Sequence, residues 1–232
     1  MVACEESQAV TTAMRALGHE AYSCDVQACS GGHPEWHVCG DALAILNPRE
    51  IREGPVRWGI AFQTMDGAHH AIEGGWDLLV AHPPCTYLSK AGGNRLRING
   101  EIQQERYQKG VAAAEFFMEF YNADCPRIAI ENPIPLKIYG LPPYSQIVQP
   151  YMFGDPWLKA TCLWLKNLPI LMATDVVVPT GKWVNCTDHR REKRPDEWAK
   201  SGKKTQKDRS KTFRGIAEAM AQQWAGQYQR KG

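Results

Sequence analysis

No apolar run in the chain approaches the roughly 18 residues that a membrane-spanning helix needs. Its first eight residues, MVACEESQ, lack the apolar region of a secretory signal peptide, so we expect a cytoplasmic protein with its eight cysteines as reduced thiols. Repeats and low-complexity tracts are also missing. These absences favour a single globular domain without a membrane contact or an obligate protein partner.

A glycine-rich phosphate loop is missing as well. The turn expected after the first strand, residues 4–10, contains no glycine, whereas dinucleotide-binding folds cradle a pyrophosphate on such glycines. The adjacent carboxylates of Glu5 and Glu6 would repel a pyrophosphate. The turn therefore argues against an NAD or FAD oxidoreductase and suits a cofactor with a cationic end and no phosphates, such as S-adenosylmethionine.

Metal-binding residues are present without a metal-binding spacing. A group of thiols and imidazoles occurs early in the chain, at Cys24, Cys29, His33, His37 and Cys39. It contains no Cys-x-x-Cys pair, and the expected strands divide it, so we expect no metal site.

Charge is distributed unevenly, although the net charge is only +2. Residues 189–214 hold eleven Lys or Arg against four Asp or Glu. This segment predicts salt-sensitive contact with nucleic-acid phosphates, and a solvated loop is the alternative interpretation. The basic residues expected to contact the substrate are Arg190, Arg191, Lys203 and Lys204.

Short apolar runs alternate with helical patterns, which predicts an α/β fold with a mostly parallel twisted sheet and helices on both faces. The expected strands are 2–4, 21–25, 36–39, 76–81, 128–130, 161–165 and 175–178, the last two as a hairpin-like pair. The expected helices are 8–17, a short one ending at 46, 63–72, 101–122 and 216–228. Ser7 is expected to cap the first helix and Gly18 to end it.

Candidate ligand-binding residues follow the expected strands at their carboxyl ends, where ligands bind in a doubly wound sheet. These residues are Cys4, Glu5, Ser7, Asp25, Asp41, Pro83 and the pair Glu131 and Asn132. An acid after the second strand suits ribose hydroxyls, although Asp25 and Asp41 taken singly are typical turn or helix caps. A nucleoside-containing cofactor is favoured by six of these residues together: Cys4, Glu5, Ser7, Asp25, Asp41 and Pro83.

A thiol and a carboxyl occupy neighbouring strand ends, at Cys85 and Glu131. This pair of groups suits attack on C6 of a pyrimidine. A lone cysteine at a strand end is usually a small buried hydrophobe, but the two prolines before Cys85 and the presence of Glu131 favour catalysis. We interpret His82 as structural rather than as a base, and together with the loop amides it is a candidate for lowering the pKa of the thiol.

These motifs resemble the DNA cytosine-5 methyltransferases, especially the short forms encoded by phages and prophages. Pro83-Pro84-Cys85 matches the proline-cysteine nucleophile motif of that family, and Glu131-Asn132-Pro133 is similar to its Glu-Asn-Val motif. Residues 149–169 and 214–224 resemble its later strand region and closing helix. The resemblance covers most of the chain but not residues 47–75.

The resemblance implies a Rossmann-like class I S-adenosylmethionine-dependent methyltransferase domain over residues 1–232. Cys85 would add to C6 of cytosine, Glu131 would assist at N3 with a pKa raised by burial, and Asn132 would belong to the same site. Asp25 and Asp41 sit where the family contacts the ribose and adenine. The implied substrate is DNA in a bacterial or phage-infected cytoplasm, and a duplex base would have to be flipped out.

Three departures from the family leave other functions open. The glycine-rich first motif is replaced by residues 4–10, the Gln-x-Arg-x-Arg motif has Lys159-x-Thr161 as its nearest substitute, and a basic segment at about 181–214 stands in place of a target-recognition domain. We expect Pro84, Lys159 and Thr161 to contact the substrate. The alternatives are the same chemistry on a free cytosine nucleotide or RNA, and a non-catalytic homologue that binds DNA or cofactor.

Overall fold

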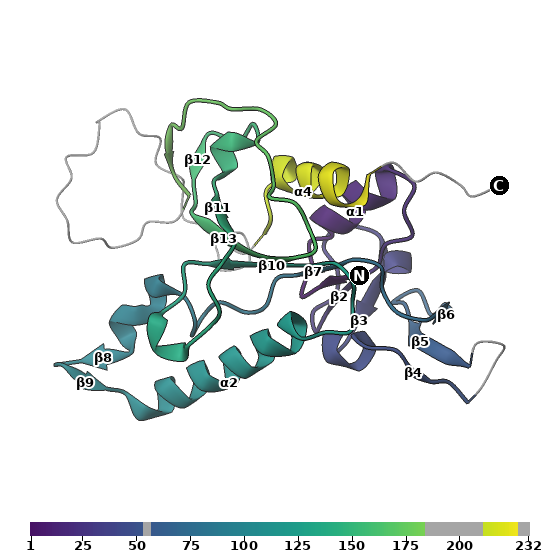
Figure 1. The fold of residues 1–232 in the computed structure, drawn as a ribbon, viewed down its shortest axis with the longest axis horizontal. Coiled ribbons are helices and arrows are strands. Elements are labelled where there is room, and N and C mark those ends of the chain that lie inside the picture. Colours follow the sequence, from purple (N-terminus) through teal and green to yellow (C-terminus); the bar gives the residue numbers. More distant parts are fainter. Residues whose placement is uncertain (53–56, 184–210, 227–232) are drawn as a thin grey trace.

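A computed structural model describes residues 1–52, 57–183 and 211–226 of the chain (Figure 1). A seven-stranded sheet lies at its centre, with strands in the order β11-β13-β10-β7-β1-β2-β3. The strands are β1 (Val2–Ala3), β2 (Ser23–Asp25), β3 (His37–Cys39), β7 (Leu79–Ala81), β10 (Ile128–Pro133), β11 (Gln146–Val148) and β13 (Thr161–Lys166). No helix in the described ranges is long and apolar enough to cross a membrane.

Five neighbouring strands of this sheet, from β3 to β10, run parallel. Strand β13 runs antiparallel to β10 and β11, the strands on either side of it. The order of the parallel strands reverses between β1 and β7, and this reversal is the switch point at which doubly wound sheets bind ligands. The expected mostly parallel α/β sheet is therefore confirmed.

Helices cover both faces of the sheet, as expected (Figure 1). One face packs against α1 (Ala9–Ala16), α4 (Arg214–Met220) and the π-helical turn η6 (Ala221–Ala225). The other face packs against α2 (Gln104–Tyr121). Successive side chains of a strand point to opposite faces of the sheet. Val80 and Ala129 therefore pack against the layer of α1 and α4, whereas Leu79 and Ile128 pack against the layer of α2.

Shorter elements surround the sheet. They are β4 (Arg49–Glu50), β5 (Trp58–Gln63), β6 (His69–Glu73), β8 (Arg97–Ile98), β9 (Glu101–Ile102), β12 (Trp157–Leu158), β14 (Gly181–Lys182), and the 3₁₀ turns η1 (Pro34–Trp36), η2 (Ala42–Ile45), η3 (Lys90–Arg95), η4 (Lys137–Tyr139) and η5 (Pro150–Met152). Strands β8 and β9 form a hairpin that projects from the N-terminal end of α2 (Figure 1). Strands β12 and β14 pair in parallel.

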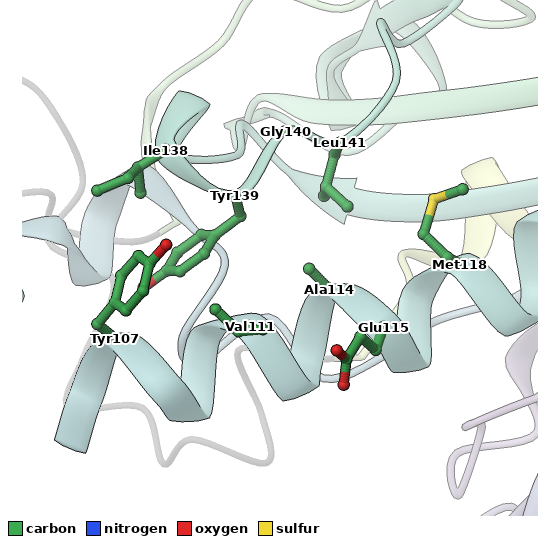
Figure 2. Close-up of a pocket in the computed structure, with 9 residues that line it drawn as sticks. All are labelled: Tyr107, Val111, Ala114, Glu115, Met118, Ile138, Tyr139, Gly140 and Leu141. Carbon is green, nitrogen blue, oxygen red and sulfur yellow. The ribbon is translucent and has the colours of Figure 1, made fainter. Parts of the chain in front are cut away.

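An apolar cavity of about 280 Å³ lies between α2 and the turn η4 (Figure 2). The rings of Tyr107 and Tyr139 stack at one end of it, with their centroids 5.9 Å apart. Gly110 allows the turn to approach the helix, because a Cβ atom at this position would lie 2.1 Å from the side chain of Tyr139.

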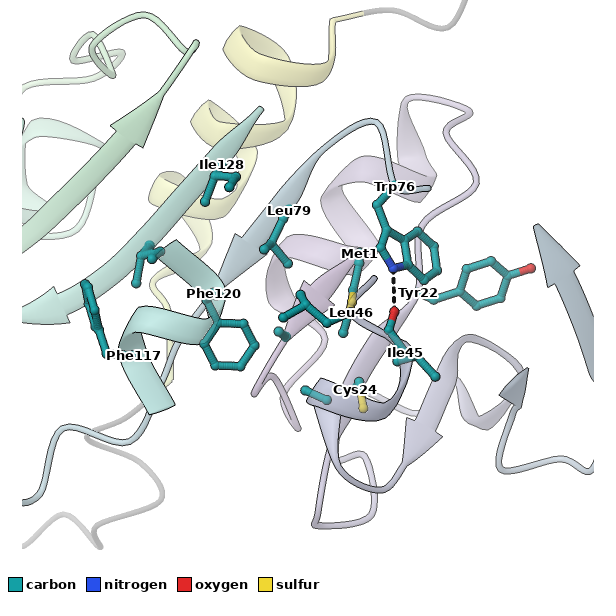
Figure 3. Close-up of a cluster of buried hydrophobic side chains, with 14 of the residues drawn as sticks. Met1, Tyr22, Cys24, Ile45, Leu46, Trp76, Leu79, Phe117, Phe120 and Ile128 are labelled. Atoms are coloured by element: carbon teal, nitrogen blue, oxygen red, sulfur yellow. Dashed lines mark hydrogen bonds between the residues drawn. The ribbon is translucent and has the colours of Figure 1, made fainter. Parts of the chain in front are cut away.

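The buried side chains beneath β7 and β10 form the larger core cluster (Figure 3). Phe117 and Phe120 project from α2 into it and are fully buried. Trp76 closes the cluster at the other end, where its Nε1 donates a 2.7 Å hydrogen bond to the carbonyl oxygen of Ile45. The indole therefore fills apolar space without leaving its N–H unsatisfied.

The helix expected over residues 63–72 is wrong, because strands β5 and β6 form an antiparallel hairpin there. Gly67 supplies the left-handed backbone of the turn, with φ at +92°. Ile60 and Phe62 alternate along β5, so both reach the core on one face of the strand. The Phe62 ring meets Tyr22 edge-on at 4.9 Å, and burial of these rings favours the hairpin over an isolated helix.

Two further expectations need correction. Residues 175–178 do not form a strand paired with β13, because β10 and β11 occupy both edges of β13; Asp175 makes only an isolated bridge to Phe153. Ser7 does not cap α1, because Gln8 is the N-cap residue and its side chain makes no capping hydrogen bond. Gly18 follows the end of α1 with φ at +89°, as expected.

Replacing Phe117 by alanine should lower the free energy of unfolding by about 3–5 kcal/mol, because it leaves a cavity in the core. Urea unfolding followed by circular dichroism measures the change. Phe116→Ala on the same helix is the matched control, since Phe116 is only half-buried. An equal loss in both variants would contradict this assignment of the core face of α2.

Candidate functional site

The loops that follow β1, β7 and β10 meet at one edge of the sheet, beside the switch point. Parallel pairing sets Ala3 beside Ala81, and Ala81 beside Ile130. The residues that follow them, Cys4, His82 and Glu131, therefore lie side by side; the chain leaves the sheet after Ala3 and Ala81, whereas Glu131 still pairs with β13. The structure thus brings together the strand ends that hold the candidate catalytic residues.

His82 and Glu131 form a buried pair at this edge. Nδ1 of His82 lies 3.0 Å from Oε2 of Glu131, and the two side chains are only 8% and 10% exposed. The backbone of His82 is also held, because its N–H donates a 2.9 Å hydrogen bond to the carbonyl oxygen of Ala3. Sequence reasoning treated His82 as structural and missed this contact, although its place directly after a strand next to that of Glu131 was a signal.

The protonation of this pair differs from the sequence-based expectation. Burial raises the pKa of Glu131, as expected, but the hydrogen bond from His82 and the positive charge of Lys159 outweigh it, so the pKa is lowered. Burial lowers the pKa of His82, but the hydrogen bond and charge of Glu131, with the charge of Glu5, raise it overall. The expectation of a raised Glu131 pKa is therefore wrong, because it ignored these neighbours.

Asn132 ties the loop after β7 to the end of β10. Its Nδ2 donates a 2.7 Å hydrogen bond to the carbonyl oxygen of Pro83, and both residues are buried. Oδ1 of Asn132 and Nε2 of His82 are buried and have no hydrogen-bond partner in the described part of the chain. Unsatisfied buried polar atoms are rare in folded proteins, and these two lie on neighbouring strands at the candidate site.

Cys85 lies on a loop that is held from two sides. Its carbonyl oxygen accepts a 2.9 Å hydrogen bond from the Ser89 N–H. Downstream, the N–H of Lys90 donates to the Ile134 carbonyl oxygen, so the loop is also joined to the segment after β10. Cys85 is half-buried and Pro84 is exposed. The thiol therefore sits near the surface on an anchored loop rather than inside the core.

The turn after β1 uses its first acid to cap a helix. Glu5 is 3% exposed, and its carboxylate accepts hydrogen bonds from the Val10 N–H at 2.6 Å and from the Thr11 hydroxyl at 2.7 Å. Burial raises the pKa of Glu5 despite these bonds. Both oxygens thus accept hydrogen bonds at the start of α1, and the expected role of Glu5 at a cationic cofactor end stays a prediction.

The other expected cofactor residues occupy the same edge of the sheet. Asp25 ends β2 and is half-buried, and its Oδ1 accepts a 2.9 Å hydrogen bond from the Gln27 N–H. Asp41 is exposed and caps η2 through its Oδ1, which lies 3.0 Å from the Leu43 N–H. Cys4 and Ser7 are half-buried, and burial raises the pKa of the Cys4 thiol. Both aspartates therefore serve as local caps with one oxygen each.

Lys159 and Thr161 approach the site from the far side of β10. Thr161 pairs with Pro133 across the β10–β13 ladder, and its hydroxyl donates a 3.1 Å hydrogen bond to the carbonyl oxygen of Lys159. Nζ of Lys159 lies 5.6 Å from the centroid of the Phe213 ring. Lys159 is close enough to Glu131 for its charge to lower the pKa of that carboxyl.

Some expected contacts lie outside the described residues. The basic residues Arg190, Arg191, Lys203 and Lys204 all fall in the range 184–210. The described residues nearest to that range belong to an aromatic cluster: Trp183 packs edge-on against Trp157 at 5.3 Å and Phe213 at 4.7 Å.

The early thiols and imidazoles have other roles. Both ring nitrogens of His37 are occupied, with Nδ1 2.8 Å from the Ser23 hydroxyl and Nε2 2.9 Å from the Gln27 carbonyl oxygen. Cys24, Cys29 and Cys39 are free thiols. No group of three or more potential metal ligands occurs in this part of the chain.

The cavity of Figure 2 is not this site, because its lining includes neither Cys85 nor Glu131. Comparison of the chain with models of known protein families finds no match, and a search of curated proteins finds no significant relative. The function of the chain is therefore inferred from the geometry of the site.

Replacing Glu131 by glutamine should lower stability by roughly 1–3 kcal/mol, because it removes one partner of a buried charged pair. The lowered pKa of Glu131 stabilises the fold above the ordinary value of 4.5, and this contribution is lost as the pH falls. The raised pKa of His82 stabilises it below the ordinary value of 6.5, and this contribution is lost as the pH rises through the raised pKa.

The stability difference should therefore be largest between about pH 4.5 and 6.5. Urea unfolding at a series of pH values measures it. Glu119→Gln on the exposed side of α2 is the matched control and should show no such maximum. A difference that is constant with pH would contradict the pairing of His82 with Glu131.

Proposed function

We propose that this protein is an S-adenosylmethionine-dependent methyltransferase that acts on C5 of cytosine in DNA. The observation that carries the proposal is the junction of two loops, in which Asn132 binds the Pro83 carbonyl oxygen and His82 binds Glu131. This junction sets the thiol-bearing loop beside the carboxyl that the chemistry requires. The resemblance of the Pro83–Cys85 and Glu131–Pro133 motifs to cytosine-5 methyltransferases supports the same conclusion.

The chemistry begins at Cys85. Cytosine C5 is a poor nucleophile, so the Cys85 thiolate first adds to C6 and makes C5 electron-rich. Glu131 then assists at N3, where the addition places charge. Its Oε2 is held by His82, whereas no described residue donates a hydrogen bond to Oε1, which leaves that oxygen for the ring. Elimination of the C5 proton and of Cys85 finally restores the aromatic base.

The residues at the edge of the sheet fit the proposed cofactor better than a dinucleotide. Glu5 already caps the start of α1, so the helix amides that would bind a phosphate are occupied by a carboxylate. Asp25 and Asp41 follow β2 and β3 on the cofactor side of the switch point, where acids suit ribose hydroxyls. Bound S-adenosylmethionine would supply the methyl group.

The basic composition of residues 189–214 supports a polyanionic substrate. We place the protein in the cytoplasm of a bacterial or phage-infected cell, where DNA is accessible. The same chemistry on a cytosine nucleotide or on RNA is an outcome of the test below. A non-catalytic homologue would have no need of a buried His82–Glu131 pair beside a thiol.

Duplex oligonucleotides containing 5-fluorocytosine should form a covalent complex with the wild type in the presence of S-adenosylmethionine, because fluorine at C5 blocks the final elimination. Cys85→Ser should abolish the complex on denaturing gels. Cys125→Ser is the matched control, since Cys125 lies before β10 at the opposite edge of the sheet.

The same assay with labelled cofactor and with dCMP, dCTP, RNA and DNA in parallel identifies the substrate class. Transfer to a mononucleotide or to RNA alone would refute the DNA assignment. Cofactor binding without transfer to any substrate would refute catalysis.

Asp25→Asn should weaken binding of S-adenosylmethionine about tenfold to a hundredfold, because a hydrogen bond from a ribose hydroxyl to a charged acceptor is lost. Isothermal titration calorimetry measures the affinity. Asp66→Asn in the β5–β6 turn is the matched control, since Asp66 is exposed on a separate sheet. Unchanged affinity in Asp25→Asn would place the cofactor elsewhere.

A further inference from the structure

We propose that His82 is a positioning residue that stores the proton required at N3 of the cytosine ring and releases it through Glu131 when Cys85 adds to C6. This inference rests on the proposed function and deepens it. In this view, Glu131 does not act alone as the acid. The buried pair acts as a unit that holds one proton.

The geometry of the pair supports a shared proton. Nδ1 of His82 and Oε2 of Glu131 are 3.0 Å apart, within hydrogen-bond distance. Pairing of β7 with β10 fixes the backbone just before His82 and Glu131. A hydrogen bond from the His82 N–H to the carbonyl oxygen of Ala3 fixes the backbone of His82 against β1. The hydrogen bond therefore orients the Glu131 carboxyl while the pair holds its proton on His82.

The charges that face His82 come from three different segments of the chain. Glu131 at the end of β10 and Glu5 in the turn after β1 favour the imidazolium form, whereas Lys159 after β12 opposes it. Lys159 also favours the ionised form of Glu131, and burial opposes the charged form of each partner. The result is a raised pKa for His82 and a lowered pKa for Glu131, so the pair carries one proton between the ordinary values of 4.5 and 6.5.

The other ring nitrogen explains how the proton can leave. Nε2 of His82 is buried and has no hydrogen-bond partner in the described ranges, so an imidazolium at this position carries an N–H without an acceptor. An unsatisfied donor makes the charged form less favourable than a fully hydrogen-bonded imidazolium would be. The pair thus holds its proton in a form that a nearby base can take.

The step balances in protons and charge. The S–C6 bond forms from the Cys85 thiolate, the C5=C6 π electrons shift through the ring toward N3, and an N3–H bond forms. The Nδ1–H bond of the imidazolium breaks as an O–H bond forms on Oε2 of Glu131. The carboxyl then rotates to present this O–H to N3, and the O–H bond breaks as the N3–H bond forms. His82 ends as a neutral imidazole beside a carboxylate. When Cys85 is expelled at the end of the reaction, the N3 proton returns to the pair.

The test is the pH dependence of covalent trapping by 5-fluorocytosine DNA in His82→Asn. Asparagine keeps a donor near the position of Nδ1 but has no proton to release. The wild-type rate should fall as the pH rises through the raised pKa of His82, because the pair has then lost its proton. In His82→Asn this descending limb should disappear, with a rate at neutral pH lower by roughly 10²-fold or more.

The matched control is His69→Asn on the exposed strand β6, which should retain the wild-type profile. A second measurement is ¹⁵N NMR of the imidazole nitrogens in the free wild type, which reads the protonation of His82 without turnover. Both nitrogens of His82 should be protonated at pH 6, with a pKa above the ordinary value of 6.5.

Three outcomes decide the matter. Trapping by the wild type with an unchanged profile in His82→Asn would overturn the role of His82 alone. If the wild type traps DNA but the NMR titration shows a neutral His82, the role of His82 is overturned. This outcome does not depend on whether His82→Asn folds. A protonated His82 in a wild type that traps no substrate would instead refute the proposed function on which this role rests.

Discussion

Three residue pairs between β7 and β10 decide the arrangement of the candidate site: Leu79 with Ile128, Val80 with Ala129, and Ala81 with Ile130. Parallel pairing in this register makes the next residues of both strands, His82 and Glu131, neighbours. A shift of the register by one residue would turn the core face of the strand toward the other helix layer, where its side chains do not fit. Burial of the core therefore fixes the contact at the edge of the sheet.

Burial also determines the chemistry available at that edge. A carboxyl and an imidazole that are each about nine-tenths buried cannot keep isolated charges, so they are compatible with the fold only as a hydrogen-bonded pair. Lys159 and Glu5 act on His82 with charges of opposite sign. The protonation of the site is therefore a property of four residues from four segments rather than of Glu131 alone.

The start of α1 provides a second constraint. Helices begin with backbone N–H groups that lack partners, and in nucleotide-binding folds a phosphate often satisfies them. Here Glu5 satisfies two of these groups, at Val10 and Thr11, from within the chain. A phosphate at this turn would have to compete with the Glu5 carboxylate for these two N–H groups. The absence of a glycine-rich loop is consistent with this. A ligand at the switch point has to be recognised by other groups, such as the aspartates after β2 and β3.

The sequence by itself determined the parallel sheet, the helices on its two faces and the strand ends that carry the candidate residues, because alternation and helical periodicity are local patterns. It was wrong over residues 63–72, where contact of Phe62 with Tyr22 and Trp76 outweighs local preference. The strand expected over residues 175–178 was also wrong. The local sequence does not show that both sides of β13 are already paired, with β10 and β11. Only the tertiary structure decided the pairing of His82 with Glu131 and the direction of their pKa shifts, because both depend on charges brought together from distant parts of the chain.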